Sequence, residues 1–570
     1  MKRTLSLLTT LVMLTPVCLP AQNRHSVVIT EIMADPTPSA GLPAYEWIEI
    51  KNISSAAINL QQWRLADAGG QSGGFPSFLL MPDSMAIVCG NTAAPLMAPY
   101  GQVIAVGSFP SLANEGDIIS LKSAAGTLIH TVSYSPHWYN NALKKEGGWS
   151  LEMRDTGWPC GGGANWTASE NPAGGTPGKK NSVNGIVTDT SGPRLLRTYS
   201  SDSLSLILVF NETTDSLSAS DKSAYTISDG TVIQSVLPVG PLFQEVKISF
   251  STPLQKRRVY QVTVSGIRDC RGNLIREGSP VKAGLAEEAG WGDIIVNEIL
   301  FNPLPGGADY IEVYNRSQKI LDAGRLFLAN RSSSLLLSNT LQISQVPWFI
   351  YPGEYTVITE TDGQLASFYT VKDSNNILTV SSLPSYPDAS GYVILLNTAG
   401  VITEEVPYRD DWHFRLLGNT EGVSLERISP DGLSPDPRNW HSAASTAGYG
   451  TPGYENSQYR GWQEPAGKIE TDPPVFSPDN DGRDDLARIR YSFIQQGYMA
   501  TLTVFDTGGR PVRQLVRNEL AGLQGSWYWD GLDDRGRPLP PGPYILLAEF
   551  FHAEGKTERH KKVLVLAGKR

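Results

Sequence analysis

Cysteine is scarce in this sequence, and the few cysteines are far apart. The 570-residue chain has four, and Cys18 lies in the apolar N-terminal stretch. Cys89, Cys160 and Cys270 are too widely spaced for a zinc site, and in an exported chain they allow at most one disulfide and leave one thiol over. The sequence does not decide which two of these three cysteines form the disulfide. Cys89 lies in the apolar run MAIVCG, where we expect a small buried hydrophobic residue.

Recognisable catalytic motifs are also absent from the sequence. It contains no nucleophile elbow, H-E-x-x-H pair, phosphate loop or dinucleotide fingerprint. The seven histidines are scattered, and no two stand at a metal-ligand spacing. His137 and His413 lie in equivalent aromatic stretches, SPHWY and DWHFR, where we prefer a structural loop anchor to a binding role. The sequence predicts a protein that is not an enzyme and needs no organic cofactor.

Positive charge is in deficit. The chain has 47 Lys and Arg against 57 Asp and Glu, a net charge of −10 and a pI near 5.4. An acidic chain gains nothing from general attraction to phosphates, which disfavours nucleic acid and anionic membranes as partners.

A long hydrophobic run occurs only at the N-terminus. Lys2 and Arg3 precede an apolar stretch that reaches Val17, with small residues near Ala21, so we interpret residues 1–21 as a signal peptide. The residues before Cys18 lack the small side chains of a lipobox, which disfavours lipidation. No other stretch has the roughly 18 apolar residues that cross a bilayer. The sequence predicts export without a membrane span.

What the sequence has instead is many short alternating runs, separated by turn residues, and a long internal repeat. EWIEIKN at 46–52 returns as DYIEVYN at 309–315. Alternation predicts a half-buried strand, with Ile48 and Ile50 toward a core and Glu49 on the opposite face. Regular punctuation by Gly, Pro, Asn and Asp is typical of antiparallel sandwiches. We therefore expect an all-β fold of tandem immunoglobulin-like (Ig-like) β-sandwich domains.

Further phrases extend the repeat. VVITEIMADP corresponds to IIVNEILFNP, GWSLEMRD to GVSLERIS, and GTPGKKNS to GTPGYENS, and each half also carries an Asn-Trp pair. In this order the phrases resemble the lamin-tail domain, which implies an Ig-like sandwich known in many exported bacterial proteins. We assign residues 22–183 and 287–458 to two such domains. The second copy departs at residues 326–345, where an insertion lengthens the middle hairpin.

Two other modules complete the predicted organisation. Residues 184–286 resemble a bacterial Ig-like domain that ends in a phrase with Asp269 and Asn273. Residues 468–570 resemble the Ig-like domain of flagellar hook-capping proteins and the C-terminal domains of exported proteins in gliding Gram-negative bacteria. The second resemblance implies a type IX sorting signal, with the type IX secretion machinery as a partner, and a secreted or outer-surface location on a Gram-negative bacterium.

One loop has the composition of a metal site. The phrase SPDNDGRDD brings Asp479, Asp481, Asp484 and Asp485 together, and carboxylate oxygens suit a hard cation such as Ca²⁺. The loop does not fit the EF-hand register. The simpler alternative is a turn in which Asp and Asn accept backbone N–H bonds and Gly482 takes a positive φ.

Glu31 with Glu49, mirrored by Glu298 with Glu312, are the only recurrent carboxylate pairs, and hence the only candidates for acid/base catalysis. We prefer solvated strand residues, or acceptors for the backbone of a neighbouring loop, over catalysis.

Tryptophans offer the other candidate surface, since they could hold a polysaccharide by stacking. The candidates are Trp63, Trp138, Trp149, Trp166, Trp412 and Trp440, of which Trp166 and Trp440 are expected as core anchors. The leading interpretation is a non-enzymatic binding, adhesion or scaffold protein of the cell surface, with an unknown surface protein or polysaccharide as partner. A nucleic-acid-binding or nuclease-associated accessory and a hydrolase with an unrecognised site are the alternatives.

Overall fold

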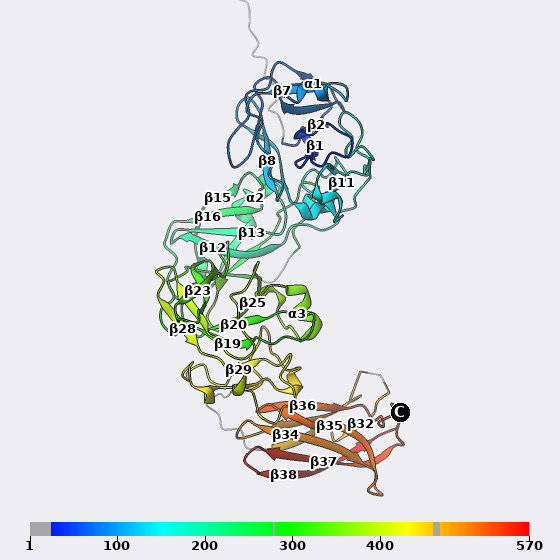
Figure 1. Ribbon diagram of the computed structural model, residues 1–570, viewed down its shortest axis with the longest axis vertical. Helices are drawn as coiled ribbons and strands as arrows, with labels where there is room; N and C mark the ends of the chain where they lie inside the picture. Colours follow the sequence, from blue (N-terminus) through cyan, green and yellow to red (C-terminus); the bar gives the residue numbers. More distant parts are fainter. Residues whose placement is uncertain (1–23, 277–279, 460–467, 480–481, 569–570) are drawn as a thin grey trace, which may run out of the picture. The chain divides into compact units, whose positions relative to one another are not determined.

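The computed structural model describes residues 24–276, 280–459, 468–479 and 482–568. The predicted signal peptide, residues 1–21, lies outside them. The chain is almost entirely β-structure, which confirms the predicted fold class (Figure 1). It divides into two compact units, one of Met1–Thr198, Leu204–Thr252 and Tyr260–Lys282, the other of Tyr199–Ser203, Pro253–Val259 and Ala283–Arg570.

The first half of the internal repeat, described over residues 24–183, is a sandwich of a large and a small sheet, and the second half is residues 287–458. The large sheet has the order β11-β10-β1-β2-β6-β7. Its strands are β1 (Val27–Met33), β2 (Trp47–Asn52), β6 (Met85–Gly90), β7 (Val103–Val106), β10 (Leu151–Met153) and β11 (Trp166–Ala168). The small sheet has the order β4-β8-β9, with β4 (Arg64–Ala66), β8 (Asp117–Lys122) and β9 (Leu128–Tyr134). A two-stranded pair, β3 (Ile58–Asn59) with β5 (Leu79–Leu80), flanks them.

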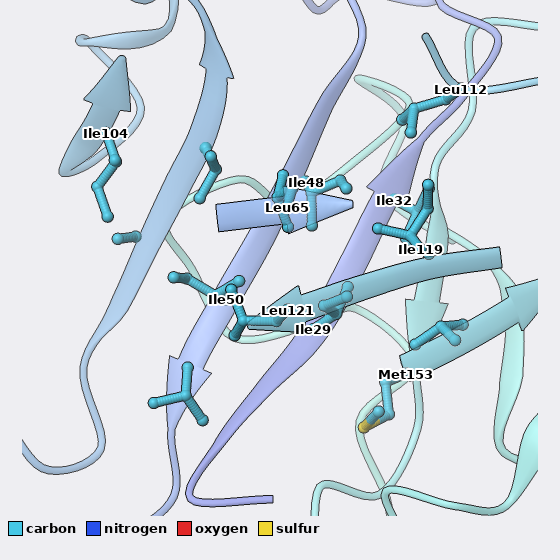
Figure 2. Packing of buried hydrophobic residues seen from close by; sticks show 14 of the residues in the cluster. Ile29, Ile32, Ile48, Ile50, Leu65, Ile104, Leu112, Ile119, Leu121 and Met153 are labelled. Atoms are coloured by element: carbon cyan, nitrogen blue, oxygen red, sulfur yellow. The ribbon is translucent and has the colours of Figure 1, made fainter. Parts of the chain in front are cut away.

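Alternating apolar residues of the two sheets meet in one core. Ile29, Ile48 and Ile50 of the large sheet belong to the same buried cluster as Ile119 and Leu121 of the small sheet, and Figure 2 shows these side chains close together. Each is 0% exposed. Burying one such side chain contributes roughly 1.5–3 kcal/mol, so the paired faces hold this half together.

The prediction that the strand at 46–52 is half-buried was wrong. Trp47 and Glu49, on the face opposite the core, are as fully buried as Ile48, and β1 is buried at every position. A second apolar cluster covers that face and includes Trp47, Cys89 and Met97 of the short helix α1 (Ala94–Met97). The two faces of the large sheet are therefore both covered.

The second half repeats this topology. Its large sheet has the order β26-β25-β20-β19-β29-β30, which is the first arrangement read from the other edge. The strands are β19 (Ile294–Leu300), β20 (Tyr310–Asn315), β25 (Tyr355–Thr359), β26 (Ile377–Thr379), β29 (Leu425–Arg427) and β30 (Trp440–Ser442). Even the irregularity in β1 between Ile29 and Glu31 recurs in β19 between Val296 and Glu298. The recurrence of the opening phrase thus reflects a recurring strand position.

The two halves differ in the small sheet. In the second half it has the order β23-β22-β27-β28, with β22 (Leu326–Arg331), β23 (Leu337–Gln342), β27 (Val393–Asn397) and β28 (Ile402–Val406). The additional strand, β23, pairs with β22 and comes from the segment that the sequence marked as an insertion. The predicted lengthening of the hairpin is confirmed. A pair β21 (Leu321–Asp322) with β24 (Phe349–Ile350) and the helix α3 (Asp362–Phe368) complete this half.

Two further segments form sheets of their own. The middle segment has sheets of order β12-β13-β16-β15 and β14-β17-β18. Their strands are β12 (Leu195–Asp202), β13 (Ser205–Phe210), β14 (Tyr225–Ile227), β15 (Ile233–Val239), β16 (Glu245–Phe250), β17 (Tyr260–Val264) and β18 (Val281–Ala283), with α2 (Ser216–Ala219) after β13.

Cys160 and Cys270 form a disulfide and Cys89 is a buried free thiol, so the expectation of at most one bridge is confirmed.

The C-terminal segment is a further sandwich with its own aromatic-rich core. Its sheets have the orders β31-β33-β36 and β32-β38-β37-β34-β35. The strands are β31 (Lys468–Asp472), β32 (Val475–Phe476), β33 (Ala487–Ser492), β34 (Tyr498–Phe505), β35 (Pro511–Ala521), β36 (Gln524–Trp529), β37 (Gly542–His552) and β38 (Thr557–Leu566). Within the described residues, no helix has the length and apolar character needed to cross a bilayer.

Candidate functional site

The recurrent glutamates form one buried cluster in each half. In the first cluster, Glu31 of β1 lies directly opposite Glu49 of β2 and Glu152 of β10. All three are 0% exposed. Opposed residues on antiparallel strands lie about 4.5–5.5 Å apart on one face, so the carboxyl groups form a row across three strands. The second half has the same row, made of Glu298, Glu312 and Glu426.

A closing segment at the end of each half lies across this row and donates backbone N–H groups to it. In the first half the closing segment is residues 175–183. Its Thr176 N donates to Glu31 Oε1 at 2.7 Å and its Gly178 N to Glu49 Oε2 at 2.6 Å. Its Val183 N donates to Glu152 Oε2 at 3.2 Å. Gly178 has φ +73°, and a Cβ there would collide with the carbonyl of Tyr100, so the approach requires glycine.

The closing segment of the second half, residues 450–458, uses the same three contacts. The N–H groups of Thr451, Gly453 and Gln458 donate to Glu298, Glu312 and Glu426 at 2.8, 2.5 and 2.8 Å. The recurring GTPG phrase is thus the partner of the recurring glutamates. The expectation that these glutamates accept backbone bonds from a loop is confirmed, and the alternative that they are solvated is wrong, because all of them are 0% exposed.

Burial raises the pKa of Glu31, Glu49, Glu298, Glu312 and Glu426. It raises the pKa of Glu31 well above its ordinary range, and repulsion from Glu49 and Glu152 adds to the shift. Burial likewise raises the pKa of Glu49 to about 7, and burial with repulsion from Glu298 raises that of Glu426 to about 8. The clusters therefore retain protons near neutral pH. A carboxyl group without access to solvent cannot exchange a proton with an outside substrate, so the arrangement supports a structural clamp.

Sequence reasoning did not single out Glu152 and Glu426. Both stand in the repeated SLE phrase, so the signal was present in the alignment. The sequence did not show which distant backbone groups bond to these glutamates. Glu152 and Val183 are 31 residues apart, and Glu31 and Thr176 are 145 apart.

The proposed calcium loop is described only in part, since Asp481 lies outside the described residues. Gly482 has φ +85°, as expected for a turn, and its N–H donates to Asp485 Oδ2 at 3.0 Å. Ser477 N donates to the carbonyl of Asp484 at 2.8 Å, and Ser477 Oγ to Asp479 Oδ2 at 3.3 Å. These contacts agree with the turn, and Ca²⁺ binding at Asp479, Asp481, Asp484 and Asp485 stays a prediction.

A second acidic group was not foreseen. Carboxylate oxygens of Asp189, Glu212 and Asp269 lie within 4.8 Å of one another. Asn273 Nδ2 donates to Asp269 at 2.8 Å and to Asp189 at 3.2 Å. Burial and the two neighbouring acids raise the pKa of Glu212 to about 7, so this group also holds a proton readily. The sequence carried no spacing signal for it, because the three acids come from separate loops.

The tryptophans separate into buried and accessible groups. Trp63, Trp166 and Trp440 are no more than 2% exposed, which removes all three as stacking surfaces and confirms Trp166 and Trp440 as the expected core anchors. Trp138 and Trp412 are half-buried and rest on these anchors, with ring centroids 6.2 Å from Trp166 and 6.3 Å from Trp440. Trp149 is half-buried beneath Lys144.

The equivalent histidines lie in different environments. His413 is buried with its Nδ1 2.9 Å from Ser442 Oγ, as a loop anchor requires, whereas His137 is exposed.

Comparison with known proteins supports the fold of the N-terminal part. Residues 20–136 match the family model described as Lamin Tail Domain. No curated protein matches the chain.

Similar solved structures are distant. They include the N-terminal part of the bacterial S-layer protein SbsC (14% identity, 38% of this chain and 43% of that one, TM-score 0.16). A Ca²⁺-stabilised adhesin that helps an Antarctic bacterium bind ice matches at 9% identity (96% and 100% covered, TM-score 0.12). The Bacteroides ovatus protein SGBP-B, in complex with a mixed-linkage heptasaccharide, matches at 9% (89% and 93% covered, TM-score 0.17). This chain spans less than half of the SbsC structure. At such TM-scores these likenesses carry no argument about function.

Proposed function

We propose that this chain is an exported, non-enzymatic protein that binds or scaffolds at the outer surface of a Gram-negative bacterium. The observation that carries the proposal is the enclosure of the recurrent carboxylates. The glutamates that recur as candidates for acid/base chemistry are 0% exposed and hold closing segments in place. What the two halves present to solvent is the outside of their sandwiches.

Under this proposal, export depends on the C-terminal segment. Its last strand, β38, pairs with β37 along ten residue pairs and with β32 in parallel, so it is an integral strand of the sandwich. Under the proposal, the type IX secretion machinery recognises this folded segment, residues 468–570, and carries the chain across the outer membrane.

The test is protease access on intact cells of a gliding Gram-negative host. The full chain should be cut by protease added outside, and a chain that lacks residues 468–570 should be protected in the periplasm. A periplasmic marker enzyme that stays uncut is the control for an intact outer membrane. Protection of the full chain would contradict the surface location, and equal cutting of both chains would contradict the sorting role.

A further inference from the structure

The second half carries a groove that the first half does not share. It encloses about 730 Å³, within the range of 300–1,000 Å³ common for ligand sites. The hairpin of β22 and β23 supplies one wall, including Asn330, Arg331 and Asn339. The other wall comes from residues 385–392 and 407–412. Because β23 is the strand added by the insertion, this groove depends on the feature that distinguishes the two halves.

Three aromatic side chains line the groove, and one of them, Tyr408, is 0% exposed. Tyr392 and Trp412 are both half-buried, so each leaves part of its ring accessible. Trp412 is supported from below by the buried Trp440, and Tyr392 lies beside the guanidinium of Arg331, 5.8 Å from its ring centroid. Rings held in this way offer a flat apolar surface at low cost in conformational entropy.

The charges in the groove are balanced. Arg331 makes two bonds to Glu405, of 2.7 and 2.8 Å, and Arg409 makes two to Asp411, of 3.0 and 2.8 Å. Each guanidinium is therefore matched by a carboxylate, and the groove has little net charge with which to attract a polyanion.

Neutral polar groups provide the remaining contacts. Asn330 donates to the carbonyl of Ser385 at 2.8 Å, and its side-chain oxygen accepts a long bond of 3.4 Å from Asn339. Asn339 is exposed, and Ser332 and Ser390 also line the groove. Amides and hydroxyls can donate and accept, as a ligand with many hydroxyl groups requires.

We propose that this groove binds a neutral polysaccharide. A sugar ring presents C–H groups on its faces, which pack on Tyr392 and Trp412, and hydroxyls at its edge, which bond to Asn339 and to the serines. The proposal rests on the proposed function, since an exported surface protein meets such polymers, and it names the ligand class and the site.

The first half provides a matched control. Trp138 rests on Trp166 with an interplanar angle of 32°, the same angle as between Trp412 and Trp440. Its surroundings differ, because it lines a smaller cavity of about 280 Å³ and the first half has no counterpart of β23. Replacing either tryptophan removes an equivalent packing contact, but only Trp412 belongs to the groove.

The experiment is affinity electrophoresis of the full mature chain, residues 22–570, in gels that contain neutral polysaccharides. The panel is mixed-linkage glucan, xyloglucan, galactomannan and mannan, with alginate and heparin as polyanions. At least one neutral polymer should retard the chain. Trp412→Ala and Tyr392→Ala should weaken that retardation about ten-fold, the equivalent of one lost stacking contact of typical strength, and Trp138→Ala should leave it unchanged.

A variant at an exposed position covers the case in which Trp412→Ala does not fold. Asn339 has φ +49°, so Asn339→Gly removes the amide at a backbone position that glycine tolerates, and it should weaken retardation in a chain with an unchanged melting temperature. Retardation by polyanions alone, by none of the neutral polymers, or equally lost in Trp138→Ala would overturn the proposal. Protease access on cells is independent of all these outcomes, so a failed groove and a failed surface location give different results.

Discussion

The two halves have different side chains at one equivalent buried site. At equivalent places beside the irregularity in the first strand, the first half has His130 and Met153, and the second has Glu404 and Arg427. His130 is neutral, because Ile29 N donates to its Nδ1 and its Nε2 lies 3.0 Å from the carbonyl of Pro159. Burial lowers its pKa to about 4, which agrees with a neutral ring.

In the second half an ion pair takes that place. Arg427 donates to the carbonyl of Val296 at 2.6 Å and to Glu404 at 2.5 Å, and both side chains are almost completely buried. The glutamate cluster next to each pair is the same in both halves. The comparison teaches that both halves keep the clamp on the closing segment, whereas the neighbouring polar site takes two different arrangements that each satisfy the backbone.

The largest effect is expected from removing the cation of that pair. Arg427→Met places the residue of the first half in the second and leaves Glu404 buried without its charged partner. Losing one member of a buried pair costs about 3–5 kcal/mol, so we expect a loss of this size in the free energy of unfolding, measured by urea denaturation.

The double variant Glu404→His with Arg427→Met is the matched control. It recreates the pair of the first half and should recover more than half of the loss. A single variant that costs less than about 1 kcal/mol, the value of an exposed pair, would show that the buried pair is dispensable.

The clamp itself should contribute equally to both halves. Glu49→Ala leaves Gly178 N without its acceptor, and Glu312→Ala does the same to Gly453 N. Each should lower the free energy of unfolding by about 1–3 kcal/mol, the cost of an unsatisfied buried donor. Glu115→Ala, at an exposed position, serves as the control in the same denaturation series. An effect in only one half would contradict the equivalence of the clusters.

The raised pKa values in the clusters predict that the folded state loses stability as the pH rises, which is the opposite of the usual effect of a buried, ion-paired carboxylate. The pKa of Glu426 is raised from 4.5 to about 8, so the folded state binds the extra proton. Stability from this group is full below about pH 4.5 and is lost as pH rises toward 8, at up to about 1.4 kcal/mol per pH unit. Glu426→Gln should flatten the decline of stability with rising pH.

The useful range for this measurement lies above the ordinary pKa of histidine, 6.5. Burial lowers the pKa of His413 and His441 to about 4, so these rings stay neutral there and add no slope. Glu455→Gln, at an exposed position in the same closing segment, should keep the wild-type slope in chemical denaturation. If the free energy of unfolding fell with pH at the same slope in both variants, Glu426 would not be the group that holds the proton.

The smallest effect is expected at the tip of the hairpin that only the second half has. Leu336 is 68% exposed, so Leu336→Ser should change the free energy of unfolding by no more than about 0.5 kcal/mol. Leu328→Ala, in the same hairpin but 0% exposed, should cost about 2–5 kcal/mol. Similar melting temperatures for the two variants would show that the hairpin does not share the core.

The fold followed from the sequence where local rules suffice. Alternation placed Ile48 and Ile50 in the core, turn residues separated the strands, and the repeat anticipated the shared topology. The buried anchors Trp166 and Trp440 were also predictable, because a large ring beside Asn recurred in both halves.

The clusters were not predictable by those rules. Alternation describes one sheet face as solvated, and a carboxylate there reads as polar surface. The closing segment, more than a hundred residues from Glu31, and the apolar cluster around Trp47 and Met97 together turn that face into an interior. The groove had a partial signal in the insertion at 326–345, but its second wall comes from loops that no spacing connects to it.

The disulfide of Cys160 with Cys270 has a mechanical consequence. The bridge joins residues 110 positions apart, so tension applied to the two ends of the chain passes through the sulfur atoms and bypasses the enclosed segment. Most strands of the middle segment lie in this bypassed stretch, and roughly 350–400 Å of contour length stays hidden from extension. A molecule stretched by shear would release this length only after reduction of the bridge.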